Sequence, residues 1–298
     1  MLLSKEYIIR IFVPIICFLI IDVAFVKGNT IVLSKQQTFY ANVNTVLNFA
    51  GNKSDVSITT WSKDSIKVYI KLQFSHKNRS TAITESKYAI YNMSKQGNTI
   101  YINNNFSLPS GITNIKSVVS ISYNIYVPDN ITIIINNKYG SCSLSDFHGH
   151  VNLNNSYGNI NINNTKGYIR IFGNLCSINM DTMNGILECD TKNTDYILKN
   201  LNGKASIKNT TGKFEIRPGQ ELKHLVINTT HSEVHLIVSN FKMFNYDLRT
   251  KYGKVELTKN TSELIPFNSD GKLYYENNGV NPFIKISTSF NNINLIQI

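Results

Sequence analysis

The sequence contains few of the residues on which several protein classes depend. Its 298 residues include four cysteines, six prolines and a single tryptophan, and 19 acidic residues stand against 30 lysines and arginines. Beyond the N-terminal segment only Cys142, Cys176 and Cys189 remain, an odd number without paired spacing, which argues against a disulfide framework. The chain also has no Ser/His/Asp signature, no glycine-rich phosphate loop and no Cys-x-x-Cys pair. The motifs of common hydrolases, nucleotide-binding enzymes and thiol redox enzymes are therefore missing.

The apolar run near the N-terminus, residues 11–21, is too short to cross a membrane and is followed by Asp22. Two basic residues precede the run, and Val26 and Gly28 supply small residues at the positions that a signal peptidase reads. Residues 1–28 are therefore predicted to be a signal peptide. We expect the protein to be exported to the periplasm, the cell surface or the medium.

The chain is basic, with a formal net charge of +11. Removal of residues 1–28 takes away three positive and two negative charges, which leaves +10. Such a charge suits acidic polysaccharide, lipid phosphate or extracellular nucleic acid. No dense run of like charge marks a dedicated patch, so scattered surface lysines are the simpler interpretation, and we expect no specific nucleic-acid binding.

Glycine recurs on a nine-residue count in the second half of the chain. Two and four positions after every slot the residue is apolar, as in Val151/Leu153 and Ile160/Ile162. This alternation predicts short strands with one apolar face and excludes a helix. Polar pairs such as Asn154-Asn155 follow as turn formers, and glycine is expected to supply positive φ at each corner. The corner glycines are Gly140, Gly149, Gly158, Gly167, Gly185, Gly203 and Gly212.

A strand and turn of nine residues cannot bury an apolar face alone, so fixed-period repetition predicts a stacked solenoid. The two corner series differ, which predicts coils of about eighteen residues with two main strands each. We expect regular repeats over residues 131–298, with the chain ending inside the solenoid. Residues 29–130 are β-rich but out of register and are predicted to cap the first edge. A short helix is expected within residues 84–96.

Three segments carry a resemblance to a known family. They are Tyr126-Ile-Val-Pro128 continuing to Asn137-Lys138-Tyr139-Gly140, the coils of residues 146–162, and the segment of residues 58–70. In these segments the chain resembles the bacterial putative-adhesin family of glycine-punctuated β-strand repeats, also described as adhesin-like or autotransporter-adhesin-head-like. The resemblance implies an all-β, right-handed parallel β-solenoid, a location in the cell envelope and no known catalytic residues.

Some β-solenoids are polysaccharide lyases or hydrolases, which need clustered carboxylates. In the regular repeats Asp146 and Asp181 occupy turn positions, and Glu188 points outward singly. The histidines at 148 and 150, and those at 231 and 235, are spaced for one strand face but have no third metal ligand nearby in the sequence. We expect no catalytic residues, no metal site and no cofactor.

Exposed tyrosines are the remaining candidate for a ligand face. Tyr139, Tyr157, Tyr168 and Tyr252 are expected near the surface beside asparagine and lysine, a combination that suits sugars and, with lysine, acidic glycans. The alternative is that these rings only stabilise neighbouring coils.

These observations predict an exported, non-enzymatic β-solenoid acting as an adhesin-like binding or scaffolding module of the bacterial cell envelope. Its partners would be glycans, envelope polymers or another envelope protein. One alternative is a periplasmic envelope-stress accessory protein that recognises another protein or the membrane surface. A third is a polysaccharide-active enzyme whose site lies in the N-terminal third.

Overall fold

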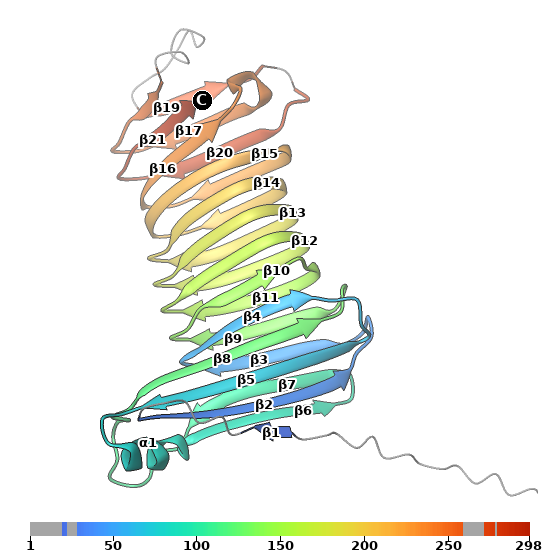
Figure 1. The fold of residues 1–298 in the computed structure, drawn as a ribbon. Coiled ribbons are helices and arrows are strands. Elements are labelled where there is room, and N and C mark those ends of the chain that lie inside the picture. The colour runs from blue at the N-terminus through green and yellow to red at the C-terminus, as the bar shows by residue number, and fades with distance from the viewer. Residues whose placement is uncertain (1–19, 23–28, 259–270, 278) are drawn as a thin grey trace, which may run out of the picture.

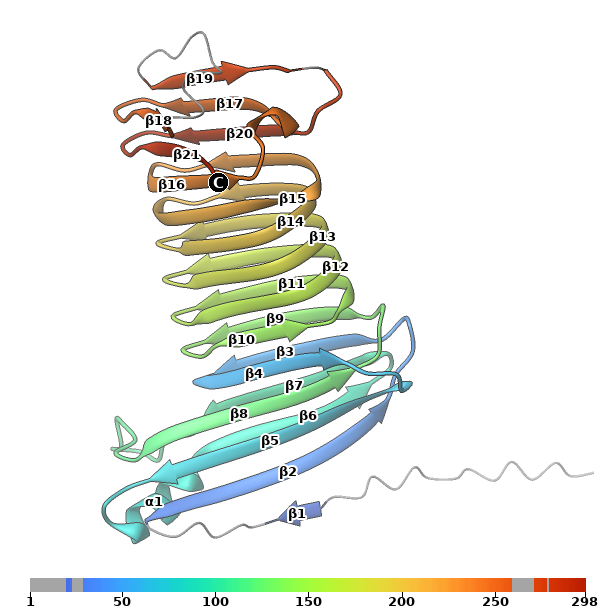
Figure 2. The same cartoon turned by 45° about the horizontal axis from the view of Figure 1, so that its top comes forward.

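The protein is an elongated stack of β-strands with a broader N-terminal end (Figures 1 and 2). This computed structural model describes residues 20–22, 29–258, 271–277 and 279–298. Strands dominate those residues, so the predicted all-β class is confirmed. Among the described helices, none is long and apolar enough to span a membrane. The predicted signal peptide lies outside the described residues, apart from β1 (Ile20–Asp22), which pairs antiparallel with β2 (Thr30–Tyr40).

The body of the stack consists of strands that pair in parallel with an offset of eighteen residues. Asn159 pairs with Ser177, which pairs with Asp195. The first part of β12 pairs with β10 and its second part with β11, so one long strand serves two faces of the stack. The strands are β9 (Thr132–Lys138), β10 (Cys142–Ser145), β11 (His148–Ser156), β12 (Asn159–Asn174), β13 (Ser177–Lys192), β14 (Asp195–Lys208), β15 (Thr211–Asn228) and β16 (His231–Val238). The right-handed winding stays a prediction.

The core follows the alternation in the sequence. All eighteen apolar side chains at the second and fourth positions after the slots, from Cys142 to Ile216, are at most 4% exposed. Fully burying one large apolar side chain stabilises the fold by about 1.5–3 kcal/mol, so stacking is the main source of stability. The three described cysteines are buried and free. Burial raises the pKa of Cys142 and of Cys189 to about 12, which keeps both thiols protonated and unreactive.

One column inside the stack is polar. Asn137, Asn155, Thr191 and Asn209 are buried where the chain turns from one face to the other. The Asn137 amide donates to the Ser54 carbonyl at 3.0 Å, and the Asn209 amide donates to the Thr194 carbonyl at 2.9 Å. These side chains satisfy carbonyl groups that lie beyond the regular ladder. Asn155, expected as a turn former, is therefore an interior residue.

The strands between residues 30 and 127, which we call the cap, extend both faces of the stack and are partly antiparallel. On one face the order is β2, β5 (Ser65–Ser75), β8 (Val118–Val127), β4 (Ser54–Thr60) and β10. On the other face it is β6 (Ala89–Gln96), β7 (Thr99–Phe106), β3 (Val46–Asn52) and β9. In Figure 2 this N-terminal end is broader than the body above it.

The prediction of a short helix within residues 84–96 is wrong for most of those residues. The helix α1 is Arg79–Ser86, because the Asn78 side chain accepts from the Ser80 N–H at 2.9 Å and starts the helix earlier. The later residues form β6, which pairs with β7 through a tight turn at Gly97, where φ is 57°. The positive φ of this glycine favours a hairpin.

At both ends a coil distant in sequence is inserted into the stack. The coil β3–β4 lies between β7–β8 and β9–β10. The coil of β20 (Phe283–Thr288) and β21 (Ile293–Gln297) lies between β15–β16 and the pair β17 (Asn245–Thr250) and β18 (Val255–Leu257). A 3-10 turn, η1 (Phe241–Met243), precedes β17, and β19 (Lys272–Tyr275) pairs antiparallel with it. The last strands belong to the stack, but the sequence did not predict that they pair between earlier coils, out of chain order.

Candidate functional site

Three aromatic side chains from different segments meet on the outer face of the cap. Trp61 follows β4, Tyr69 lies in the middle of β5 and Tyr126 lies near the end of β8. The Trp61 and Tyr126 ring centroids are 5.5 Å apart, and those of Tyr69 and Tyr126 are 6.1 Å apart in an edge-on arrangement. The Trp61 indole N–H donates to the Ser65 carbonyl at 2.7 Å, which holds the ring in place. These rings form a preorganised apolar surface.

Strand alternation explains why polar side chains surround the rings. On β5, Val68 and Ile70 are buried in the core, so Lys67, Tyr69 and Lys71 face outward. Antiparallel pairing places them in rows across the sheet, each with one residue of β2 and one of β8. The rows are Thr38–Lys67–Tyr126, Gln36–Tyr69–Asn124 and Ser34–Lys71–Ser122. The middle row therefore sets a tyrosine ring between two amides.

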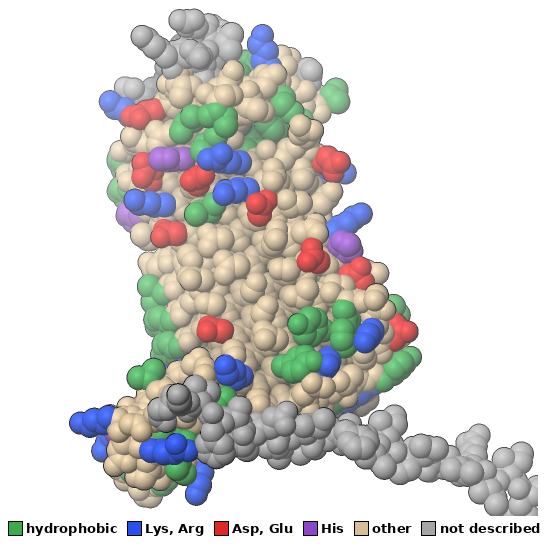
Figure 3. Space-filling view, in the orientation of Figure 1, with side chains coloured by type: hydrophobic (Ala, Val, Ile, Leu, Met, Phe, Trp, Pro, Cys, Tyr) green, Lys and Arg blue, Asp and Glu red, His purple; other side chains and the backbone are tan. Residues whose placement is uncertain are grey.

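These residues line an open cleft of about 600 Å³, which we call the aromatic–lysine cleft. Its lining is Ser34, Lys35, Gln36, Trp61, Lys67, Tyr69, Ile70, Lys71, Ser122, Asn124 and Tyr126. This set of lining residues holds no aspartate, glutamate, histidine or cysteine. Figure 3 shows hydrophobic side chains and lysine or arginine side chains gathered together on the cap. The cleft thus offers rings, amides, hydroxyls and positive charge.

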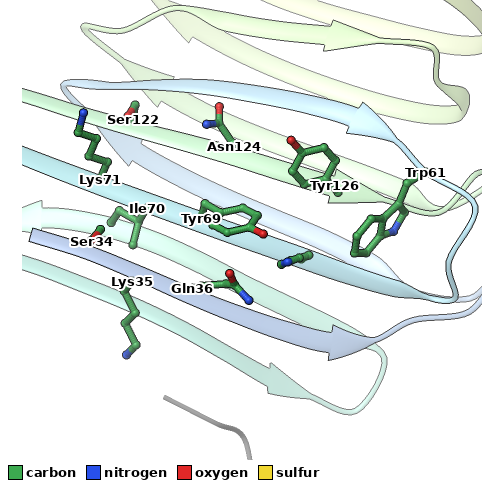
Figure 4. Close-up of a pocket in the computed structure, with 11 residues that line it drawn as sticks. Ser34, Lys35, Gln36, Trp61, Tyr69, Ile70, Lys71, Ser122, Asn124 and Tyr126 are labelled. Carbon is green, nitrogen blue, oxygen red and sulfur yellow. The ribbon is translucent and has the colours of Figure 1, made fainter. Parts of the chain in front are cut away.

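The lysines lie against the rings. The Lys67 Nζ is 4.6 Å from the centroid of the Tyr69 ring, and the Lys63 Nζ, just outside the cleft, is 5.2 Å from the Trp61 ring. Lys35 points the other way, with its Nζ 5.5 Å from the Tyr91 ring, and Figure 4 shows it directed away from Tyr69. The positive charge that faces the cleft therefore comes from Lys67 and Lys71, with Lys63 at its edge.

Two of the predicted ligand-face tyrosines lie together on a corner of the body. Tyr139 and Tyr157 are 47% and 45% exposed, and their rings stack with centroids 4.9 Å apart. Both have positive φ, 59° and 60°, which is uncommon for a large side chain. The Lys138 Nζ lies 4.9 Å from the Tyr139 ring. This pair has the geometry of a ladder between coils, and its role as a ligand face stays a prediction.

The other two predicted ligand-face residues, Tyr168 and Tyr252, do not join this pair. Tyr252 stacks on Phe290 with centroids 5.1 Å apart, in the C-terminal coils. Tyr168 lies on β12, where its hydroxyl donates to the Glu188 carboxylate at 2.7 Å. That hydrogen bond raises the pKa of Tyr168 because it favours the protonated phenol. The four tyrosines therefore do not form one continuous face.

The corner glycines have two different structural roles. Gly149, Gly167, Gly185 and Gly203 have φ between 77° and 154°, a region that suits glycine. Gly140 and Gly158 are not among the positive-φ residues, because the tyrosine before each one takes that conformation instead. A Cβ on Gly158 would collide with the Gly140 carbonyl oxygen. The expectation of positive φ is wrong for this last pair, where close approach of the neighbouring coil requires glycine.

The acids considered for catalysis and the histidines considered as metal ligands include residues with local partners. Asp146, with φ 56°, accepts from the Asn164 amide at 2.7 Å. His148 lies 3.0 Å from Asp129, and His231 stacks on Phe290. Within the described residues no group of three histidine, cysteine or acidic side chains could hold a metal ion.

The sequence interpretation missed the aromatic–lysine cleft. Two signals pointed to it: Trp61 is the single tryptophan of the chain, and residues 66–70 alternate as a strand that puts Lys67 and Tyr69 on the polar face. The third ring, Tyr126, lies 57 residues after Tyr69, and only the antiparallel pairing of β5 with β8 brings them together.

These features define an all-β repeat protein with an open aromatic surface on its N-terminal cap. The chain belongs to the Toastrack DUF4097 family, whose model matches residues 44–295. No curated protein matches the chain.

Several solved structures are similar to the chain at low identity. One is a putative cell adhesion protein from Clostridium sporogenes, at 14% identity and a TM-score of 0.30, covering 89% of this chain and 100% of that one. Another is a putative adhesin from Parabacteroides distasonis, at 9% identity and a TM-score of 0.31, covering 89% and 97%. A third is a putative lipid binding protein from the same species, at 10% identity and a TM-score of 0.30, with the same coverage.

Proposed function

We propose that the protein is an exported, non-enzymatic binding module of the bacterial cell envelope, and that the aromatic–lysine cleft binds a glycan. The observation that carries the proposal is the convergence of Trp61, Tyr69 and Tyr126 around one concavity lined by amides and hydroxyls. Aromatic rings stack on the apolar faces of sugars, and amides and hydroxyls bond sugar hydroxyls.

The cleft is favoured over the corner tyrosines for a geometric reason. Tyr139 and Tyr157 stack on each other at a corner of the body, and each already uses one ring face on its neighbour. In the cleft, Gln36 and Asn124 flank the Tyr69 ring on the outward face of the same sheet. Ring and amides can therefore contact one ligand at the same time.

A non-enzymatic role is supported by the side chains that line the cleft. Glycoside hydrolysis uses a pair of carboxylates, and lyase chemistry uses carboxylates with a base. The lining offers lysines and tyrosines but no carboxylate. Binding through an open surface of this kind is weak, in the millimolar to micromolar range of about 4–8 kcal/mol, and is strengthened by repeated engagement along a polymer.

Binding to immobilised cell-envelope polysaccharides, measured with the full chain, tests the binding role. The double variant Trp61→Ala with Tyr69→Ala should lose at least about tenfold in affinity. The matched variant Tyr139→Ala with Tyr157→Ala should keep it. Equal binding by both variants, or greater loss in the corner variant, would reject the cleft as the site. Reducing sugar released from the bound polymer would reject the non-enzymatic role.

The location is tested separately on intact cells of the source organism. N-terminal sequencing of the mature protein should begin at Asn29 if residues 1–28 are a signal peptide. External protease should degrade a surface-displayed protein and spare a periplasmic one. A chain that keeps Met1 and stays with the cytosolic fraction would overturn export.

A further inference from the structure

The charges around the cleft indicate which class of glycan it binds, an inference that rests on the proposed glycan-binding function. Lys67 and Lys71 face outward on either side of Tyr69, and Lys63 stands at the Trp61 edge. Among the residues that line the cleft there is no acid to neutralise them. On the adjacent strand β4, the carboxylate of Asp55 accepts a hydrogen bond from the Ser141 backbone N–H at 2.8 Å.

The spacing of these lysines suits a linear ligand. Alternate residues of a strand lie about 6.5 Å apart on one face, so the Cα atoms of Lys67 and Lys71 are about 13 Å apart, with Tyr69 between them. A ring stacked on Tyr69 would have an ammonium group on each side along the strand. The Lys67 Nζ, 4.6 Å from the Tyr69 ring centroid, can reach a charge carried by that same sugar.

We propose that the aromatic–lysine cleft selects an anionic linear polysaccharide of the uronic-acid class over a neutral glycan. Tyr69 stacks on a sugar ring, Gln36 and Asn124 bond its hydroxyls, and Lys67 and Lys71 bind carboxylates of that sugar and its neighbour. Each carboxylate–ammonium contact is a charge-assisted hydrogen bond. Four uncharged polar side chains line the cleft, Ser34, Gln36, Ser122 and Asn124, against the two lysines that face it. This composition favours a hydroxyl-rich polymer over single-stranded nucleic acid, which is bound mainly by aromatic rings and positive charge.

The test compares one polymer in two charge states. Oligogalacturonate and its fully methyl-esterified form share a backbone and differ in carboxylate charge, and calorimetry with the full chain measures both. The acidic form should bind about tenfold more tightly, and its affinity should fall as salt rises from 50 to 500 mM, because exposed charge pairs are screened. The ester should show little salt dependence.

Two double variants with the same change in net charge separate the cleft from general basicity. Lys67→Gln with Lys71→Gln should lower affinity for oligogalacturonate about tenfold and leave the ester unchanged. Lys213→Gln with Lys223→Gln, on the exposed surface of β15, should change neither by more than about twofold. Thermal unfolding of all variants confirms that each one is folded.

The outcomes distinguish this inference from the proposed function. If the ester binds as tightly as the acid and Trp61→Ala with Tyr69→Ala abolishes both, the glycan site stands and charge selection is wrong. If neither polymer binds, but immobilised neutral envelope polysaccharides do, the uronate class is wrong. Tighter binding of a single-stranded oligonucleotide, lost in the Lys67/Lys71 variant, would overturn both proposals in favour of nucleic acid.

Discussion

Leu175 occupies the corner position that Tyr139 and Tyr157 hold in the two preceding coils and Asn193 in the next. Its φ is 55°, and its side chain is 47% exposed. A left-handed conformation costs an L-residue about 1–2 kcal/mol, but asparagine adopts it more readily. At Asn193, φ is 50°. Leucine at this corner therefore carries a backbone cost with little burial in return.

We expect Leu175→Asn to raise the free energy of unfolding by about 1 kcal/mol. Chemical denaturation measures the change. Ile197, 40% exposed on β14 and absent from the positive-φ residues, is the matched control. Ile197→Asn should be neutral or destabilising, since asparagine is disfavoured in a strand. A destabilised Leu175→Asn variant would show that the corner leucine contributes more by contact than the backbone costs.

The residues that could be predicted from the sequence are those whose role repeats. The eighteen apolar side chains were predicted because alternation with a fixed period leaves one arrangement that buries them all. The interior position of Asn155 was not predictable in this way. Asn164 has φ 48°, whereas Asn155 is absent from the positive-φ residues and is fully buried. The same residue type serves both corners, and only the bend of the backbone decides which side chain turns inward.

At the scale of elements, α1 is tied to the loop before β8 by one carboxylate. Glu85 is 5% exposed and accepts hydrogen bonds from the backbone N–H groups of Lys116 and Ser117 at 2.9 and 2.7 Å. Burial alone would raise the pKa of Glu85, but the hydrogen bonds outweigh it and hold the pKa below its usual value. The ionised form is therefore the one that stabilises this end of the cap.

Glu85→Gln should lower the free energy of unfolding at pH 7 by about 1–2 kcal/mol, because a neutral amide replaces the charged acceptor of two backbone hydrogen bonds. The pKa is lower in the folded state than in the unfolded state. The stabilisation is thus present above the ordinary pKa of about 4.3 and lost as pH falls through the lowered folded value. Denaturation curves between pH 7 and pH 2 should show wild type and variant converging in acid. A constant difference across this range would contradict the assignment.

The aromatic–lysine cleft is formed by the pairing of separate strands, which explains why it was not predicted from the sequence. The alternation of residues 66–70 was visible, so the outward direction of Lys67 and Tyr69 followed from the chain alone. Their meeting with Tyr126 depends on antiparallel pairing between β5 and β8, whose partners are separated by a helix and two strands. Local periodicity contains no information on such a pairing, whereas the repeats of the body pair with their sequence neighbours.

The whole molecule departs from a simple solenoid at its ends. In an ordinary stack each coil contacts only its sequence neighbours, so terminal coils fray first. Here β20 lies between β15 and β17, and β21 lies between β16 and β18. This coil, the last of the described strands, thus lies between other coils in space, and we expect the outer strands β17–β19 to depend on it.

A pair of core truncations tests this dependence. Ile286, fully buried on β20, pairs with Ile227 on one side and Leu248 on the other. Leu273, 1% exposed on β19, pairs with Leu248, its single strand partner among the described residues. Each substitution by alanine removes buried methyl groups and should cost about 2–5 kcal/mol locally. Hydrogen exchange should differ sharply between the two variants.

In Ile286→Ala, amide protection should fall across β20, β17, β18 and β19 together, because loosening the inserted coil releases everything stacked beyond it. In Leu273→Ala the loss should stay within β19 and its partner β17. Faster exchange confined to β20 in Ile286→Ala would contradict this, because it would mean that the outer strands stay folded without the inserted coil. The expected pattern would show that the inserted coil at residues 283–297 holds the outer strands of the C-terminal end in the stack. The coil β3–β4 has the equivalent position at the N-terminal end, where β4 pairs with β8 of the cleft.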